Sequence, residues 1–277
     1  RGITVNKFRI NVDFIFTDWE IDGPLEVNGA FEASKKCTRC KERLGDDFSF
    51  AEFQKTMREM RAYLQYYSFS EPVLYQFPRA LVGNYGDYPN DSGYRYWYDY
   101  FEYYVDGVPF KADQGAKYRQ WYNNFPNTGF TFAMPVMYTW SDIYNWYDFK
   151  NTDYRWFYNM LLVASNVGKS TPQSIPIISF VHWNTIFEGR RLDSNVMQMS
   201  AKSYQELLWH MLLRGTDTFF MWSEKKDFPE EVRLVQEVYS SAQQYGDYLE
   251  RGLPITYDVS VNPGIVISGL ALGDKVL

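Results

Sequence analysis

The stretch Asn11-Val12-Asp13-Phe14-Ile15-Phe16-Thr17-Asp18-Trp19-Glu20 decides the fold that the sequence predicts. Apolar and β-branched residues fill its centre, which indicates a buried strand. Because side chains alternate between the faces of a strand, Asp18 and Glu20 leave the same face at its carboxyl end, with Cα atoms about 7 Å apart. Two carboxylates this close do not both ionise freely, so one is expected to keep its proton near neutral pH. The pair is a candidate general acid with its partner; the alternative is a strand end that caps a loop or binds an arginine.

Composition narrows the class of protein. The chain has 277 residues, of which 45% are hydrophobic, enough for one large domain or a barrel with an appendage. No stretch approaches the roughly 20 apolar residues of a membrane span, so no membrane partner is expected. Aromatic residues reach 19%, and such rings suit the faces of a sugar or fill core and surface. The net charge of −6 argues against a nucleic-acid partner but leaves room for a local basic patch.

Two cysteines lie close together in Cys37-Thr38-Arg39-Cys40. A zinc site would need more ligands, but His182 and His210 lie far along the chain and no second cysteine pair exists. A redox motif would need the helix start after a strand that thioredoxin-like units have, and the pattern does not predict one. We therefore expect a local disulfide or a pair of loop thiols, and neither a metal site nor a cofactor.

Five predicted strands alternate with predicted helices. The strands lie near residues 8–17, 73–77, 131–138, 175–181 and 218–222, and the helices near residues 48–67, 113–123, 154–167, 201–214 and 228–248. Such alternation gives an α/β fold with parallel strands and right-handed crossovers. Five units fit either an open doubly wound sheet or the last five units of an eightfold barrel. The absence of a glycine-rich phosphate loop after any strand removes the nucleotide-binding form of the open sheet.

Boundary signals add detail to this pattern. Residues 21–47 are polar and are expected to form a long loop, after which Asp46 or Asp47 caps a helix. Gly168 is an expected helix end, and Ser200 an expected helix cap. Residues 255–261 and 265–270 read as strands separated by a turn.

Polar and aromatic residues cluster directly after the predicted strands. They are Asp18 and Glu20, Tyr75, Tyr138 and Trp140, Trp183 and Asn184, and Trp222 and Glu224. Repeated decoration of one end of the strands is typical of barrel enzymes. Tyr96, in the aromatic segment 94–101, is a further candidate sugar contact. Glu188, in the loop after the fourth strand, is either a second carboxylate of the site or a solvated loop charge.

Five segments together resemble the hyaluronidases of glycoside hydrolase family 56. Asp18-Trp19-Glu20 is similar to that family's Asp-aromatic-Glu strand, and later segments match in the family's order over about residues 8–252. These are Tyr75-Gln76-Phe77-Pro78, Pro135-Val136-Met137-Tyr138, Ile175-Pro176-Ile177 and Gly215–Trp222. Ile21-Asp22-Gly23-Pro24 stands where the family has Trp-Arg-Pro, and the family's disulfide cysteines are absent, which implies a distant relative.

The resemblance implies an endo-acting glycoside hydrolase for a hyaluronan- or chondroitin-like polysaccharide. Glu20 would protonate the glycosidic oxygen, and Asp18 would orient the 2-acetamido group that attacks in place of a protein nucleophile. Tyr75 and Tyr138 would hydrogen-bond the acetamido group or the developing charge. Trp222 would form the floor under the sugar.

Two alternatives stay open. One is a glycoside hydrolase for another polysaccharide, such as a sulfated or neutral galactan, that uses Glu20 and a second carboxylate such as Glu188. The other is a carbohydrate-binding barrel that holds a glycan in an aromatic cleft without cutting it.

The resemblance also implies how the chain is divided. The family's Asp-x-Glu strand is the fourth of eight, so we expect a (β/α)8-type TIM barrel whose first three βα units are missing from this chain. Residues 1–252 would supply strands four to eight, and residues 253–277 would begin a C-terminal β domain or extension. A secreted, periplasmic or cell-surface location is expected, and the lack of a visible signal segment says little because the chain starts at Arg1.

Overall fold

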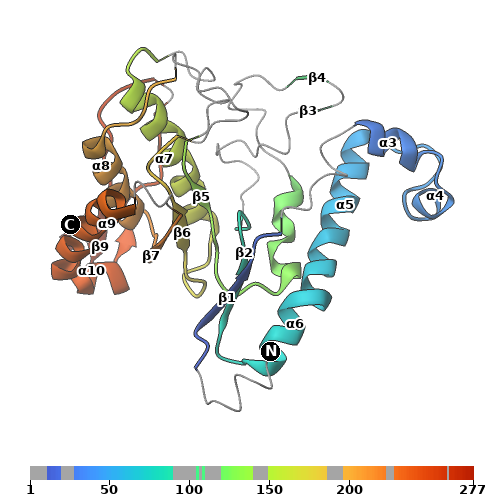
Figure 1. Ribbon diagram of the computed structural model, residues 1–277, viewed down its shortest axis with the longest axis horizontal. Coiled ribbons are helices and arrows are strands. Elements are labelled where there is room, and N and C mark those ends of the chain that lie inside the picture. Colours follow the sequence, from blue (N-terminus) through green and yellow to red (C-terminus); the bar gives the residue numbers. More distant parts are fainter. Residues whose placement is uncertain are drawn as a thin grey trace. The chain divides into compact units, whose positions relative to one another are not determined.

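The structure is a computed structural model that describes residues 11–19, 28–89, 104–105, 108–109, 120–139, 149–185, 196–222, 228–260 and 262–277. The chain divides into two compact units. Their helices and strands are labelled in Figure 1. Unit 1 comprises residues 1–93 and 98–133, and unit 2 comprises residues 94–97 and 134–277.

Unit 1 joins a parallel strand pair to a group of helices. Its elements are β1 (Phe14–Thr17), α3 (Asn28–Ser34), α4 (Thr38–Leu44), α5 (Phe50–Gln65), the π-helical turn η1 (Tyr66–Ser70), α6 (Glu71–Gln76), β2 (Leu81–Asn84), β3 (Tyr104–Val105), β4 (Val108–Pro109) and the 3₁₀-helix η4 (Gln120–Thr128). The long helix α5 packs along η4.

The strands β1 and β2 run parallel, with Phe14 opposite Leu81 and Thr17 opposite Asn84. The ring of Phe132 lies 5.5 Å from that of Phe14, centroid to centroid. A Cβ atom on Gly83 would lie 2.6 Å from the Phe132 ring, so only glycine lets this ring cover β2. The pair is therefore fixed by packing as well as by its backbone hydrogen bonds.

The strand predicted at residues 73–77 is wrong. These residues belong to α6 and to the turn after it, and the second strand is Leu81–Asn84. The π-helical turn η1 carries the helical path of α5 directly into α6, and Pro72 lies in the first turn of α6, where proline is tolerated. A short apolar run does not by itself distinguish a strand from a helix.

The loop expected at residues 21–47 contains two helices in its described part, α3 and α4. Phe31 and Leu44 pack against a cluster of Phe48, Phe50 and Phe53. The cap of α5 is Ser49, and not Asp46 or Asp47 as predicted, because Ser49 and Glu52 form a reciprocal capping box. Cys37 and Cys40 are free thiols. The sequence predicted either this state or a local disulfide.

Unit 2 is built on three parallel strands in the order β5-β6-β7. Its elements are β5 (Val136–Met137), α7 (Thr152–Ser170), β6 (Ile178–Val181), α8 (Ala201–Leu212), β7 (Thr218–Met221), α9 (Phe228–Ala242), the 3₁₀-turn η6 (Gln243–Tyr245), α10 (Gly246–Arg251), β8 (Leu253–Pro254), β9 (Leu270–Leu272) and β10 (Lys275–Val276). The α/β alternation predicted for this region is confirmed. In the described residues the sheets are small and open, so the eightfold barrel stays a prediction.

Two helix boundaries in unit 2 differ from their predictions. The helix predicted at residues 228–248 is divided into α9, η6 and α10. The helix α7 continues past Gly168, where an end was predicted. A Cβ atom on Gly168 would overlap the carbonyl oxygen of Arg214, so this glycine permits a close backbone approach and is not a cap. The cap predicted at Ser200 is confirmed, since its side chain accepts from the Ser203 N–H.

The C-terminal residues form an antiparallel sheet, β10-β9-β8, within unit 2. The strands predicted at residues 255–261 and 265–270 are wrong, because the described residues there are largely irregular. Arg214, which is 1% exposed, donates to the carbonyl oxygens of Asp258 and Ile267 at 3.1 Å and 3.0 Å. Backbone atoms that would pair in a strand are therefore engaged by a buried guanidinium. The division into a barrel and an appended β domain stays a prediction.

Candidate functional site

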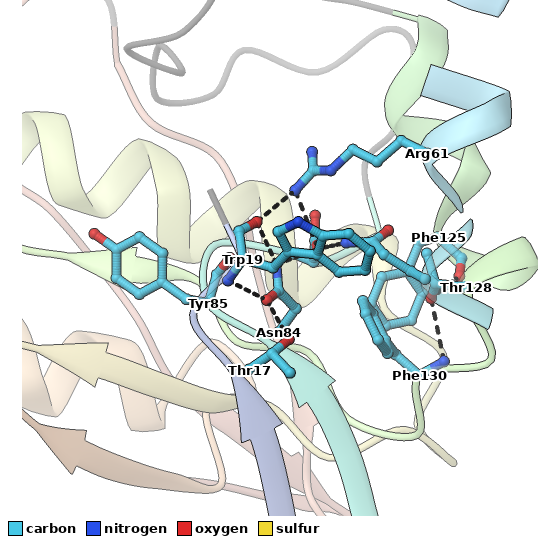
Figure 2. Close-up of polar contacts among 10 residues, drawn as sticks. Thr17, Trp19, Arg61, Asn84, Tyr85, Phe125, Thr128 and Phe130 are labelled. Carbon is cyan, nitrogen blue, oxygen red and sulfur yellow. Dashed lines mark hydrogen bonds and ion pairs between the residues drawn. The ribbon is translucent and has the colours of Figure 1, made fainter. Parts of the chain in front are cut away.

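Asn84, the last residue of β2, fixes the carboxyl end of β1. Its Oδ1 accepts from the Thr17 hydroxyl at 2.6 Å and from the backbone N–H of Trp19 at 2.9 Å. Its Nδ2 donates to the Trp19 carbonyl oxygen at 3.4 Å (Figure 2). The peptide groups on both sides of Trp19 are therefore held by one fully buried side chain. The backbone of Trp19, directly after Asp18, is thereby fixed.

A second layer of contacts holds the Asn84 amide. Asp87 Oδ2 accepts from Asn84 Nδ2 and from Gln65 Nε2, both at 2.8 Å, and lies 3.5 Å from Arg61 Nη2. Arg61 Nη2 also donates to the Trp19 carbonyl oxygen at 3.5 Å (Figure 2). Because a carboxylate only accepts, Asp87 fixes which side of the Asn84 amide is Nδ2. Arg61 and Gln65 both lie on α5, so this helix supports the strand end.

Asp18, one member of the predicted carboxylate pair, is described and exposed at the end of β1. Glu20 lies outside the described residues, so the pairing of the two carboxylates stays a prediction. The prediction that a strand ends directly before Asp18 is confirmed, because β1 ends at Thr17.

Tyr85 occupies the strand-end position that the sequence assigned to Tyr75. Tyr75 lies on α6 and is 82% exposed. Tyr85 directly follows β2, and its N–H donates to the Thr17 carbonyl oxygen at 2.9 Å. The parallel register that matches Thr17 with Asn84 brings Tyr85 level with Asp18. In Figure 2 the Tyr85 ring extends away from the Asn84 contacts.

In unit 2, Trp222 stands at the centre of a group of rings where the parallel strands end. Its ring centroid lies 5.4 Å from Tyr138, 5.2 Å from His182 and 6.2 Å from Phe180. Tyr138, Phe180 and His182 are buried, whereas Trp222 is 40% exposed. The predicted candidates Tyr138 and Trp222 are thus in contact. An indole held on one side and open on the other is suited to stack against an apolar ligand face.

The buried carboxylate of Glu231, on α9, organises the end of β6. Oε1 accepts from the backbone N–H of Trp183 at 2.7 Å and from the Tyr204 hydroxyl at 3.0 Å. Oε2 lies 3.1 Å from His182 Nδ1. Burial, together with the charge of Glu231, raises the pKa of Tyr204 well above its usual value, so the hydroxyl stays protonated and donates.

Of the other predicted sugar contacts, Trp183 and Asn184 lie within the described residues, just after β6. The Trp183 indole N–H donates to the Met199 carbonyl oxygen at 2.9 Å, and Asn184 is half-buried beside it. Trp140, Glu188 and Tyr96 lie outside the described residues. No group of three or more His, Cys, Asp or Glu that could hold a metal is present in the part of the chain that the structure describes.

Sequence reasoning missed Asn84, Tyr85 and Glu231. The run Ala80-Leu81-Val82-Gly83 followed by Asn84 and Tyr85 is itself a short apolar segment that ends in polar residues. Glu231 lies in the first turn of α9, whose buried face also carries Leu234, Val235 and Val238. Glu231 precedes Leu234 and Val235 by three and four residues, so it lies on the same apolar face of the helix. A carboxylate on such a face needs buried hydrogen-bond partners, and this pattern could have identified Glu231 from the sequence.

Among solved structures, bee venom hyaluronidase is similar to this chain over 85% of this chain and 71% of its own, with a TM-score of 0.45 and 13% sequence identity. No protein-family model matches the chain, and no curated protein matches it. The likeness is a distant one in overall fold and does not assign a family. None of the described helices combines the length and the apolar character needed to cross a membrane.

Replacing Asn84 with Ala is expected to free the end of β1. The Thr17 hydroxyl, the Trp19 N–H and the Asp87 carboxylate each lose a partner in a partly buried place, at a cost of about 2 kcal/mol in the free energy of unfolding. Hydrogen exchange of the Trp19 amide should accelerate under native conditions. Asn127→Ala is the matched control, because Asn127 is exposed on η4 and its amide donates to Asn124 at 3.2 Å, away from the end of β1. Unchanged exchange at Trp19 in Asn84→Ala would contradict the role given to this amide.

Proposed function

We propose that the chain belongs to a glycoside hydrolase that cleaves a polysaccharide, with Glu20 as general acid and Asp18 as its partner. The observation that carries the proposal is the fixing of both peptide groups of Trp19 by Asn84 at the carboxyl end of a parallel strand. A catalytic acid must lie within hydrogen-bond reach of the leaving oxygen, and a misplacement of about 1 Å can cost about 100-fold in rate. A buried polar network that orients one short segment is consistent with this requirement.

The finer proposal is that the substrate assists its own cleavage. Glu20 gives its proton to the glycosidic oxygen while the carbonyl oxygen of the substrate's 2-acetamido group forms a bond to the anomeric carbon. Asp18 orients the acetamido N–H, and water then attacks the anomeric carbon and restores the acetamido group. Tyr85, level with Asp18, is proposed for the acetamido-binding role that the sequence gave to Tyr75. Hyaluronan- or chondroitin-like polymers are the proposed substrates.

The group of rings around Trp222 in unit 2 is an argument for a carbohydrate ligand. Trp222 is 40% exposed and rests on buried Tyr138 and His182, which limits its freedom before a sugar binds. Less entropy is then lost on binding. Tyr138 is proposed to hydrogen-bond the sugar, and the further proposed contacts are Trp140, Trp183, Asn184, Glu188 and Tyr96. A polysaccharide substrate also favours a secreted, periplasmic or cell-surface location.

Replacing Glu20 with Gln should abolish cleavage and leave binding intact. The amide has no proton to give at neutral pH, so kcat should fall by about 100-fold or more while KM changes little. The assay incubates the protein with a panel of polysaccharides and measures new reducing ends. Full activity of Glu20→Gln would remove Glu20 from the mechanism.

Glu188→Gln distinguishes the two enzymatic mechanisms in the same assay. Under substrate assistance Glu188 is no more than a sugar contact, so this variant should keep its kcat and show at most a raised KM. A protein nucleophile at Glu188 predicts loss of kcat instead. Binding of a polymer by the wild-type protein, with no new reducing ends from any member of the panel, would support a carbohydrate-binding function and contradict the enzymatic proposal.

A thiazoline derived from N-acetylglucosamine tests the role of Asp18. This compound mimics the ring that the acetamido group forms with the anomeric carbon, so it should inhibit competitively. Asp18→Asn should weaken its inhibition at least tenfold, and Asp13→Asn, at an exposed aspartate before β1, should not. Equal inhibition of both variants would contradict substrate assistance and leave general-acid catalysis by Glu20 standing.

A further inference from the structure

Cys37 lies in the tight turn between α3 and α4. Its N–H donates to the Ser34 carbonyl oxygen at 3.0 Å, and its own carbonyl oxygen accepts from the Lys41 N–H at 3.0 Å. The helix α4 begins at the next residue, so Cys40 lies in its first turn. Residues three apart across a helical turn are neighbours. The backbone therefore holds the two cysteines next to each other, and both thiols are free and half-buried.

The two thiols are not equivalent. The nearby backbone N–H and thiol of Cys40 hold the pKa of the Cys37 thiol below its usual value, with help from Arg39. The same thiol contact, together with burial, raises the pKa of Cys40. Cys37 is thus the better thiolate, and Cys40 is a protonated neighbour within reach.

The surroundings of the pair carry a surplus of positive charge although the whole chain is acidic. Residues 35–43 contain Lys35, Lys36, Arg39, Lys41 and Arg43 against Glu42. Lys35 pairs with Glu32 at 3.0 Å and Lys41 with Asp46 at 3.6 Å, so the surplus rests on the other three cations. Lys36, Arg39 and Arg43 are exposed. Clustered positive charge favours the thiolate and attracts anions.

We propose that Cys37 and Cys40 form a reversible dithiol–disulfide couple that exchanges with anionic disulfides of the glutathione class. The Cys37 thiolate attacks one sulfur of the disulfide, so a mixed disulfide forms and one glutathione thiolate leaves. The Cys40 thiol releases its proton to solvent and attacks the Cys37 sulfur, which expels the second glutathione. Both cysteines are oxidised, and the glutathione disulfide is reduced to two thiols. This inference does not depend on the proposed glycosidase activity.

The test reacts the reduced full-length chain with glutathione disulfide and follows free thiols and intact mass. The wild-type protein should lose two hydrogens and carry no lasting glutathione adduct. Cys40→Ser should stop at one glutathione per chain. Cys37→Ser should react at least fivefold more slowly than Cys40→Ser, because the thiolate that attacks first is missing.

A second measurement tests the proposed preference for anionic disulfides. Cystamine, a cationic disulfide, should oxidise the wild-type protein more slowly than glutathione disulfide, and added salt should narrow the difference. The double variant Lys36→Gln, Arg39→Gln should narrow it in the same way. Equal rates for the two disulfides would overturn the anionic preference. Lasting adducts on the wild-type protein, or equal rates for Cys37→Ser and Cys40→Ser, would overturn the couple itself.

Discussion

The hydrogen bonds between the Asn84 amide and the two peptide groups of Trp19 are the interaction on which the geometry at the end of β1 depends. A buried amide presents a donor and an acceptor in one rigid plane, so it can satisfy a backbone N–H and a backbone carbonyl together. It can do so only if its other contacts are satisfied, since a partly satisfied buried network is costly. The Thr17 hydroxyl, the Tyr85 carbonyl oxygen and Asp87 provide those contacts. Gln65 and Arg61, both on α5, in turn hold Asp87.

Local signals in the sequence predicted the parts of the fold that local chemistry determines. The strands that became β1, β6 and β7 are apolar runs with sharp polar ends, and Ser200 is a helix cap of the expected kind. The failure at residues 73–77 has a physical reason. The π-helical turn before α6 preserves helical hydrogen bonding through a segment whose composition suits a strand equally well. The tyrosine that directly follows the second strand is therefore Tyr85, and Tyr75 lies on α6.

The candidate site could be predicted only in part, because its supporting contacts join distant residues. Thr17 and Asn84 are 67 residues apart, and His182 and Glu231 are 49 apart. Asp18, Tyr138 and Trp222 carry their own signal, because each follows a strand directly. Asn84 and Glu231 acquire their roles only when the strand order is known. Both are buried polar groups that bond the end of a strand: Asn84 closes β2, and Glu231 on α9 accepts from the Trp183 N–H after β6.

The most direct test of this account is a crystal structure of Glu20→Gln with an oligosaccharide of a polymer that the wild-type protein cleaves. The acid is disabled in this variant, so the intact substrate should remain bound. The account predicts the glycosidic oxygen about 3 Å from the side chain of residue 20 and the acetamido nitrogen in hydrogen-bond contact with Asp18. An intact oligosaccharide bound with neither residue 18 nor residue 20 in contact would contradict the assignment of this strand end as the reacting centre.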